Sequence, residues 1–589
     1  AMWVEPDTNL SGGEALIRQF LYGRAFFREE LGVEGDTAWL PDTFGYTGAM
    51  PQILQGCGIK GLTTQKIEWS YNDSVRFPHH AFMWRGIDGT GVPSYLHMRY
   101  ETHVDVKSLR EFWSKRVDQD GSGDFFLPFG YGDGGGGPTR DEYEQARRHQ
   151  DLQGVPKLRY ETPAAYLEKK AELDLPEYRG ELYFPCHRGT YTTQAAIKKG
   201  NRRSEKLLRA LEAWNAIGVW KGEDGVANKR LEAIWKEVLF NQFHDVLPGT
   251  SIRRVNEEAC ELYEEIRVEA ESLLGQSLAR LAGEGEGITL YNDLSRDQLR
   301  LVALDASFAE GAITAEGVEV ACQPWMDGAL AMVDLPAMGS VSLLPKATPK
   351  QTAVRAYATE AGYVLENDSV KLVINDQGEV SSMIDKELGI SRIGTASNRF
   401  HLYRDIPRYY EAWDIDSQTE EREVFPEKNV SVEIVCEEGL RAAIRVTTEI
   451  SESRIEQIIS LDAEAKRVDF DTQVDWQERH RLLKVSFDTG IDALLAANQI
   501  QFGYIERPNH RSDVWEKDRF EVCNHEYTAL YDATHGAALL NDSKYGVSMK
   551  KGVIALSIES QHKPGSCGGY RGASVQVFVL LLGWQLRRF

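Results

Sequence analysis

The amino-acid sequence predicts a multidomain protein in which an α/β domain is followed by a helical bundle and then by a large all-β region. Helix-like and strand-like patterns alternate over residues 1–185, with loops rich in Gly, Pro and Asp between them. Apolar residues recur at helical spacing over residues 186–282, and apolar and polar residues alternate through residues 283–589. The length of 589 residues fits three or four domains of ordinary size.

The first region combines a helix with short buried strands. Residues 13–31 place apolar side chains, Phe20 and Phe27 among them, on one side of a helix. Residues 36–40 and 59–64 are short apolar runs near Gly and Pro, a pattern typical of buried parallel strands. This order predicts an α/β layer or a barrel.

Three apolar stripes at helical spacing predict a three-helix bundle in the middle of the chain. They consist of Leu207, Ala210, Leu211, Trp214 and Ile217, then Leu231, Ile234, Trp235, Val238 and Leu239, then Val255, Ala259, Leu262, Ile266, Leu273 and Leu278. The sequence GEGEG (283–287) ends this pattern and is typical of a linker. Beyond it, two alternating runs within residues 363–384 join at DQG (376–378), which predicts a hairpin within one or two β-sandwiches.

Composition excludes several classes of protein. Lys and Arg number 67 against 90 Asp and Glu, a net charge of −23, which argues against a nucleic-acid or anionic-membrane partner. The content of 42% hydrophobic and 10% aromatic residues excludes a disordered chain. We find no signal-peptide pattern, no run of 18 apolar residues, and seven scattered cysteines without a CxxC pair. We therefore expect a cytoplasmic protein with no disulfide framework and no cysteine zinc site.

Asp42 follows an apolar strand in the segment WLPDTFGY (39–46). In α/β folds the carboxyl ends of strands carry the reactive groups, so this carboxylate is a candidate nucleophile or hard metal ligand. From the residues alone, the alternative that Asp42 sits in a turn and caps the next helix stays open.

Asp133 lies before four glycines in the segment FGYGDGGGGP (129–138). Glycines allow the backbone to approach a ligand closely, and no Gly-Lys-Ser/Thr follows, which excludes a P-loop. Two carboxylates on separate loops over one cleft are what glycoside hydrolysis requires, one to attack the anomeric carbon and one to protonate the leaving oxygen. The alternative is a flexible loop with an incidental aspartate.

His244 and Asp245 lie where the second predicted bundle helix ends, in FNQFHDVLPGTS (240–251). They could supply an imidazole metal ligand beside a carboxylate, or a histidine that caps the helix. The segment CHRGTYTTQ (186–194) is rich in groups that hydrogen-bond sugar hydroxyls, or it forms a cap before the next helix. Turn chemistry between strands accounts for RPNHRSDVW (507–515) and ALLNDSKYG (538–546).

Taken in order, these segments resemble glycoside hydrolase family 38, the retaining α-mannosidases, and above all its cytosolic or vacuolar and bacterial branch. The resemblance covers residues 2 to about 560 and rests on six motifs: WVEPD (3–7), PDTFGY (41–46), HRGTYTTQ (187–194), HDVLPGTS (244–251), RFEV (519–522) and LLNDSKYG (539–546). It implies a (β/α)7-barrel-like catalytic domain over residues 1–185 whose N-terminal part is missing, a helical-bundle middle domain over 186–282 and a β-sandwich region over 283–589.

The resemblance also implies the residues that carry catalysis. Asp42 matches the aspartate that is both nucleophile and zinc ligand, and Asp133 matches the position of the acid/base. His244 matches the histidine that binds zinc. One Zn²⁺ per site would chelate O2 and O3 of mannose, and another divalent ion such as Co²⁺ is an alternative.

Five further residues are expected to contact the substrate. Phe44 would pack beside the sugar, Asp245 would accept a hydrogen bond from a hydroxyl, and Lys66 would contact a hydroxyl or orient Asp42. Tyr95 or His97 would border the same subsite.

We therefore expect an exo-acting, zinc-dependent retaining α-mannosidase that removes terminal mannosyl residues from oligosaccharides or glycans by double displacement. The alternative is a non-catalytic carbohydrate-binding protein. The partner is a mannose-containing oligosaccharide, and a homo-oligomer is an open expectation.

The sequence departs from the family pattern at both ends. A His-x-Asp pair that completes the zinc site is expected ahead of Met2, so this polypeptide alone is predicted to be inactive. Residues 563–589 do not match the usual ending, and we predict a frameshift at about Pro564 that leaves the tail poorly packed or disordered.

Overall fold

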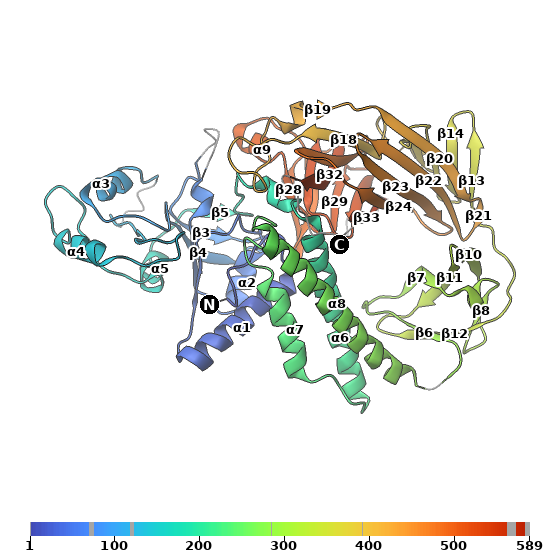
Figure 1. Ribbon diagram of the computed structural model, residues 1–589, viewed down its shortest axis with the longest axis horizontal. Coiled ribbons are helices and arrows are strands. Elements are labelled where there is room, and N and C mark those ends of the chain that lie inside the picture. The colour runs from blue at the N-terminus through green and yellow to red at the C-terminus, as the bar shows by residue number, and fades with distance from the viewer. Residues whose placement is uncertain are drawn as a thin grey trace.

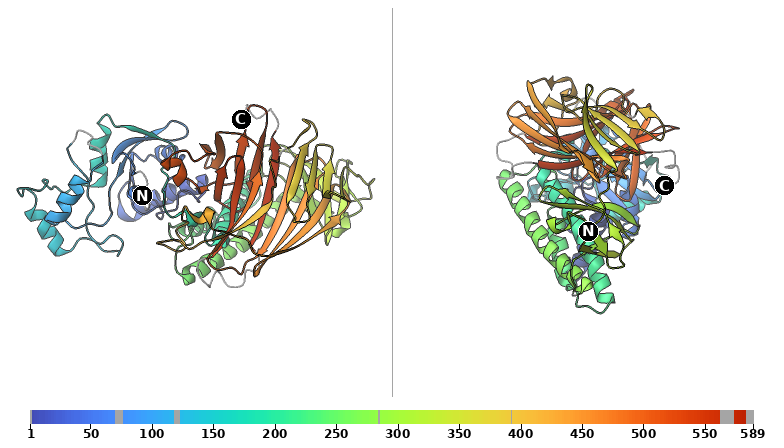
Figure 2. Two further views of the ribbon diagram at one scale, coloured as in Figure 1. Left: turned by 90° about the horizontal axis from the view of Figure 1, so that it is seen from above. Right: turned by 90° about the vertical axis from the view of Figure 1, so that its right-hand side faces the viewer.

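A computed structural model describes residues 2–69, 76–117, 123–283, 285–391, 393–561 and 573–582. Figure 1 shows the α/β region at one end of the molecule, long helices below the centre and the β strands at the other end. The left view of Figure 2, seen from above, shows the long strands of the β region lying side by side, with the α/β region to their left.

The α/β region contains an open five-stranded sheet with the order β1-β2-β4-β3-β5. Its elements are α1 (Gly13–Leu31), β1 (Thr37–Leu40), α2 (Met50–Gly56), β2 (Gly61–Thr64), η1 (Lys66–Glu68), β3 (Ala81–Arg85), β4 (Gly91–Leu96), α3 (Val106–Ser114), α4 (Arg140–Arg148), α5 (Pro163–Ala171), β5 (Glu177–Arg179) and η2 (Arg188–Tyr191). Strands β1, β2 and β4 are parallel, whereas β3 is antiparallel to β4. The predicted helix and both predicted strands are confirmed, but the described residues form no closed barrel, so the barrel stays a prediction.

Local sequence signals set the helices around this sheet. Helix α1 ends at Gly32, which adopts φ +67° and donates its N–H to the carbonyl of Arg28. Helix α4 begins with a capping box between Thr139 and Glu142. Apolar residues of α1 and α2 pack on one face of the sheet, and those of α5 pack on the other. The sheet is therefore covered on both faces, as the apolar strands predicted.

Three helices follow: α6 (Ala195–Trp220), α7 (Asn228–Phe240) and α8 (Arg253–Ala282). They share one hydrophobic cluster, to which Leu211, Trp235 and Ile266 each contribute from a different helix. Helix α8 ends just before Gly283, whose φ is +71°. Within the described part of the chain, no helix has the length and apolar character needed to cross a membrane.

A small β body comes next, with its own core around Phe308 and Leu343. Its elements are β6 (Ile288–Tyr291), β7 (Gln298–Leu304), η3 (Ala306–Phe308), β8 (Ala312–Thr314), β9 (Glu319–Val320), β10 (Cys322–Trp325), β11 (Gly328–Leu335) and β12 (Ser340–Pro345). They form one sheet of three strands and one of four.

The large β body contains three sheets, of six, six and nine strands, around one extensive core. Its elements are β13 (Val354–Thr359), β14 (Gly362–Asn367), β15 (Val370–Ile374), β16 (Val380–Asp385), β17 (Ile390–Ser391), β18 (Arg399–Arg404), η4 (Thr419–Glu421), β19 (Glu423–Val424), β20 (Lys428–Cys436), β21 (Glu438–Gly439), β22 (Arg441–Ile450), β23 (Ser453–Asp462), β24 (Arg467–Asp475), β25 (Arg481–Asp488), β26 (Leu495–Ile500), β27 (Gly503–Pro508), α9 (Val514–Asp518), β28 (Val522–Cys523), β29 (Tyr527–Tyr531), β30 (Gly536–Asn541), β31 (Gly546–Lys550), β32 (Val553–Gln561) and β33 (Ala573–Leu582). The predicted hairpin at residues 376–378 is confirmed, because it joins β15 to β16 in antiparallel register.

Strand β33 corrects one expectation about the tail. We expected residues from about 564 to pack poorly, yet β33 pairs with β24 on one side and β30 on the other. Val575 and Val577 are buried while Gln576 between them is exposed, which is the alternation that a strand in a sheet needs. Residues 562–572 and 583–589 lie outside the described part, and the frameshift itself stays a prediction.

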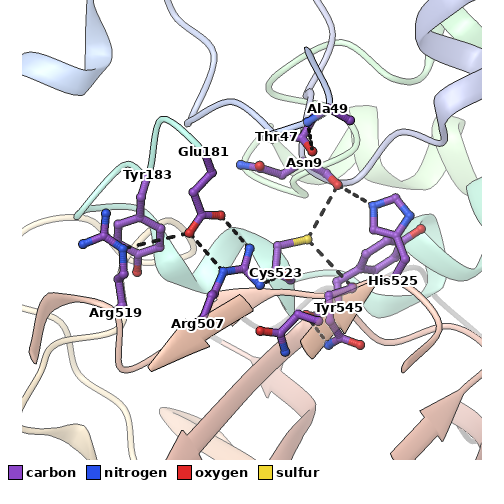
Figure 3. A network of polar contacts seen from close by, with 12 residues as sticks. Asn9, Thr47, Ala49, Glu181, Tyr183, Arg507, Arg519, Cys523, His525 and Tyr545 are labelled. Atoms are coloured by element: carbon purple, nitrogen blue, oxygen red, sulfur yellow. Dashed lines mark hydrogen bonds and ion pairs between the residues drawn. The ribbon is translucent and has the colours of Figure 1, made fainter. Parts of the chain in front are cut away.

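A buried ion pair joins the α/β region to the large β body. The Arg507 guanidinium donates from Nε and Nη2 to the two oxygens of Glu181, at 3.0 and 2.6 Å (Figure 3). Burial acts to raise the pKa of Glu181, but the charge of Arg507 outweighs it and holds the pKa below its usual value. Arg519 lies farther away, with 3.9 Å between its Nε and a Glu181 oxygen.

We expect Arg507→Met to destabilise the folded protein by about 3 kcal/mol or more, because it leaves the Glu181 carboxylate buried without its main partner. Adding Glu181→Met should recover most of that loss, whereas Arg519→Met should cost much less. Urea unfolding of the four proteins measures these differences. Equal costs for the two arginine variants would contradict the prediction.

Candidate active site

Asp42 lies in a turn that is fixed at both ends. Strand β1 stops at Leu40, whose carbonyl accepts a hydrogen bond from the Tyr46 hydroxyl at 2.6 Å. The same hydroxyl lies 2.6 Å from Thr64 Oγ1 on the neighbouring strand, and the Tyr46 N–H donates to Leu182 O at 2.9 Å. The turn of residues 41–46 is therefore held against β2 and the chain after β5.

Lys66 and His244 flank the Asp42 carboxylate. Lys66, at the start of η1 directly after β2, places Nζ 2.6 Å from Oδ1. His244, after the end of α7, places Nε2 3.6 Å from Oδ2. The Lys66 side chain is 7% exposed and that of Asp42 21% exposed, so water screens this cluster only partly. The prediction that Lys66 orients Asp42 fits this ion pair.

The surroundings keep Asp42 ionised. Burial acts to raise its pKa, but the polar contact with His244 and the charge of Lys66 outweigh it and lower the pKa from its ordinary value. A half-buried, ionised carboxylate at the carboxyl end of a strand has the state that a nucleophile requires.

The orientation of His244 is set by the main chain of Glu5. Both the His244 N–H and its Nδ1 contact the Glu5 carbonyl, at 3.0 and 3.1 Å. Because a carbonyl only accepts, Nδ1 carries the proton and Nε2 faces Asp42. Burial acts to lower the pKa of His244, but Asp42 and Asp245 outweigh it and raise the pKa.

Asp42 and His244 suit two positions of a divalent metal ion. Carboxylate oxygen and imidazole nitrogen are zinc donors, and a ligating histidine commonly donates its other ring N–H to a carbonyl, as His244 does. Within the described ranges, no group of three or more His, Cys, Asp or Glu side chains is placed to hold a metal ion. Asp42 and His244 alone are too few to complete a four-coordinate site, and their role as zinc ligands stays a prediction.

Aromatic side chains line the cluster. The Phe44 ring is buried and lies edge-on to His244 at 6.1 Å and to His187 at 5.0 Å between centroids. Lys66 Nζ lies 3.8 Å from the centre of the Trp69 ring. Phe44 therefore lies beside His244, and its predicted contact with the sugar stays a prediction. Trp69 was not predicted.

A histidine–aspartate pair beside Phe44 was also not predicted as part of the site. His187, at φ +55°, lies 2.8 Å through Nδ1 from Asp414 Oδ1, and its backbone N–H donates to the same oxygen at 2.9 Å. Tyr410 and Trp413 from the same loop lie 5.9 and 6.1 Å from the His187 ring. The motif at 186–194 indicated the histidine's neighbourhood, but only the density of aromatic and acidic residues at 409–414 could have indicated its partner.

Asp245 makes hydrogen bonds within its own loop. Its Oδ1 accepts a hydrogen bond from Thr250 Oγ1 at 2.9 Å, and its carbonyl accepts one from Ser251 Oγ at 2.8 Å. The side chain is partly exposed and adjoins His244. Its predicted hydrogen bond to a sugar hydroxyl stays a prediction.

Asp133 lies in an exposed glycine-rich loop rather than in the Asp42 cluster. Its Oδ1 accepts a hydrogen bond from the Tyr100 hydroxyl at 3.2 Å. The pKa of Tyr100 is raised, first by burial and then by the negative charges of Asp42 and Asp133. Tyr100 therefore lies within electrostatic reach of both carboxylates, and the acid/base role of Asp133 stays a prediction.

Tyr95 and His97 lie on the face of the sheet that α5 covers, opposite the face that packs against α1 and α2. Tyr95 packs in the small core with Tyr166 of α5, and its hydroxyl accepts the N–H of Phe126 at 3.1 Å. His97 is buried, stacks on Trp39 at 5.1 Å and contacts Thr63 Oγ1 through Nδ1 at 3.1 Å. The structure does not bring either residue into contact with Asp42, and their predicted contact with substrate stays a prediction.

Comparisons with known proteins agree along the chain. Residues 1–181 match the glycosyl hydrolases family 38 N-terminal domain, residues 185–281 the alpha mannosidase middle domain, and residues 365–563 the glycosyl hydrolases family 38 C-terminal domain. Alpha-mannosidase 2C1 of Homo sapiens is 35% identical over 574 residues, which cover 94% of this chain and 53% of that protein. Alpha-mannosidase of Saccharomyces cerevisiae is 32% identical over 590 residues, covering 94% and 50%. This chain thus spans about half the length of these relatives.

A solved structure shares the fold. The crystal structure of an alpha-mannosidase from Enterococcus faecalis V583 matches with a TM-score of 0.79 at 16% identity, covering 99% of this chain and 78% of that one.

The buried Asp414 carboxylate accepts two hydrogen bonds from His187, which we expect to hold the loop around it in place. We expect Asp414→Ala to speed trypsin cleavage after the exposed Arg408 about tenfold or more, because both hydrogen bonds from His187 are lost. Native-state proteolysis followed by mass spectrometry measures the rate.

Glu411→Gln is the matched control, since Glu411 lies in the same loop and only approaches His480, at 3.8 Å. Equal cleavage rates in Asp414→Ala and wild type would show that the pair does not hold the loop.

Proposed function

Because this chain belongs to glycoside hydrolase family 38, we propose that its Asp42 site hydrolyses terminal α-mannosidic bonds of oligosaccharides or glycans with retention of configuration. The observation that carries the proposal is the partly buried Asp42 carboxylate, which faces Lys66 and His244 at the end of β1. The names of its relatives support the substrate class. A cytoplasmic location and a homo-oligomeric state stay predictions.

The first half of the reaction forms a covalent mannosyl-enzyme. The Asp42 carboxylate attacks the anomeric carbon, and the bond from that carbon to the leaving oxygen breaks. Asp133 gives its proton to the leaving oxygen, so the departing alcohol is neutral. Lys66 and His244 keep Asp42 ionised and oriented until it attacks.

The second half releases mannose. Asp133, now a carboxylate, takes a proton from water, whose oxygen attacks the anomeric carbon and displaces Asp42. Two displacements at one carbon restore the starting configuration. Asp133 is exposed and therefore accessible to this water.

Side chains around Asp42 suit a sugar ring. Phe44 offers an apolar surface, and Asp245 offers a carboxylate to a hydroxyl. Asp42 and His244 would hold the metal ion, zinc by preference, in this proposal. Such an ion would supply a Lewis acid to hydroxyl oxygens of the sugar.

We expect Asp42→Asn to lower the rate of 4-nitrophenyl α-mannoside hydrolysis at least about 10³-fold in any active form of the protein, because the amide cannot attack. Asp36→Asn is the matched control, since Asp36 lies beside the other end of β1 and also pairs with a lysine, Lys60, at 2.8 Å. The control should retain wild-type activity.

Comparing α-mannoside with α-galactoside and α-glucoside tests the substrate class. Preference for either other sugar would overturn the mannoside assignment. Binding of mannosides without any hydrolysis would favour the alternative, a carbohydrate-binding protein.

We expect this chain alone to bind Zn²⁺ weakly. Two donors should supply about half of the ~10–16 kcal/mol of a four-ligand site, which corresponds to a dissociation constant between micromolar and millimolar. Calorimetric titration of wild type, His244→Ala and the control His510→Ala measures this. Stoichiometric binding at nanomolar concentration would show that the chain supplies further ligands.

A further inference from the structure

We propose that Gln501 and His525, two residues of the large β body, are positioning residues for the Asp42 turn and act through residues 5–11. The inference rests on the proposed function for its catalytic consequence. Its structural part stands on hydrogen bonds among buried groups.

Residues 5–11 carry the turn on which Asp42 lies. Their side chains and carbonyls contact the turn at three successive residues. The contacts are Thr43 Oγ1 to Pro6 O at 3.2 Å, Thr8 Oγ1 to Gly45 O at 2.8 Å and Asn9 Nδ2 to Phe44 O at 3.2 Å. The turn therefore follows any shift of this segment.

The same segment orients His244. The Glu5 carbonyl accepts both hydrogen bonds described above, and Pro6 pairs with Phe243 in an isolated β-bridge. The Asp7 N–H also donates to Gln242 O at 2.9 Å. One short stretch of chain thus contacts both His244 and the turn that carries Asp42.

The β body contacts this segment from the other side. Gln501 Nε2 donates to Ser11 O at 2.6 Å and to Thr8 O at 3.0 Å. His525 Nε2 lies 2.7 Å from Asn9 O (Figure 3). Burial lowers the pKa of His525 to about 4, so the ring is neutral and the proton on Nε2 points at the carbonyl.

These contacts determine where the segment lies because it has little regular structure of its own. Residues 5–11 belong to no helix or sheet and make one isolated bridge. Gln501 is 3% exposed, so water cannot replace its amide at the carbonyls it contacts. The β body therefore sets the position of Asp42 and Phe44 through residues 5–11.

Hydrogen–deuterium exchange of the full chain tests this directly. The Gly45 and Tyr46 amides donate to Thr43 O and Leu182 O, so their exchange reports on the turn. In Gln501→Glu the donor becomes a carboxylate of the same shape that faces the carbonyls of Thr8, Asn9 and Ser11. We expect exchange across residues 42–46 and 5–11 to rise about tenfold.

The matched control is Gln457→Glu. Gln457 is also a buried glutamine of the β body, but its Nε2 donates to Asn398 Oδ1 and Thr472 Oγ1, within that body. It should lower the overall stability without changing exchange at residues 42–46. A second pair keeps the test open if Gln501→Glu does not fold: His525→Leu should raise exchange, and His525→Gln, which retains a donor, should restore it.

Faster exchange at residues 5–11 with unchanged exchange at 42–46 would overturn the proposal, as would equal effects of both glutamine variants. In an active form, we expect Gln501→Glu to lower kcat about tenfold, since it misplaces the nucleophile. An unchanged kcat would overturn the catalytic consequence. Lack of α-mannoside hydrolysis in every form of the protein would count against the proposed function alone, because exchange does not depend on activity.

Discussion

The Asp42 carboxylate can remain ionised away from water only because Lys66 and His244 lie against it. A buried charge without a partner costs several kcal/mol, so the fold must deliver both groups to one point. Lys66 comes from the end of the neighbouring parallel strand and rests on the Trp69 ring. His244 comes from beyond α7 and is oriented by Glu5. The sheet, the helices and the N-terminal segment are each needed for this one neutralised cluster.

The β body is a working part of this arrangement. Its loop around Asp414 contacts His187 beside Phe44, and its strands contact the α/β region through Arg507 and Glu181. Both contacts are made by polar side chains, and such contacts are directional, unlike the apolar packing that also joins the two regions.

Periodic features and strand-end motifs were the predictable part. The helix at residues 13–31, the first two strands and the three helical stripes follow from spacing alone. Asp42 and His244 could be picked out from short motifs, because the neighbouring residues of each motif also form the turn on which it lies. His187 with Asp414 did not, because the partners are separated by 227 residues and both lie in irregular chain. Tyr95 and His97 could not be located in this way. Both side chains lie on the α5 side of the sheet, and a motif does not reveal on which side of a sheet its residues lie. Strand β33 was misjudged because an unfamiliar sequence can still satisfy a period of two.

The separation between Thr8 and Gln501, 493 residues, has a consequence for biosynthesis. At about 5–20 residues per second, a ribosome needs roughly 25–100 s to make the chain between them. During that interval the N-terminal stretch has emerged while its partner does not yet exist. Until the last strands are made, residues 5–11 therefore lack their hydrogen bonds to Gln501 and His525. A chaperone that binds exposed segments can bind the nascent α/β region during this interval.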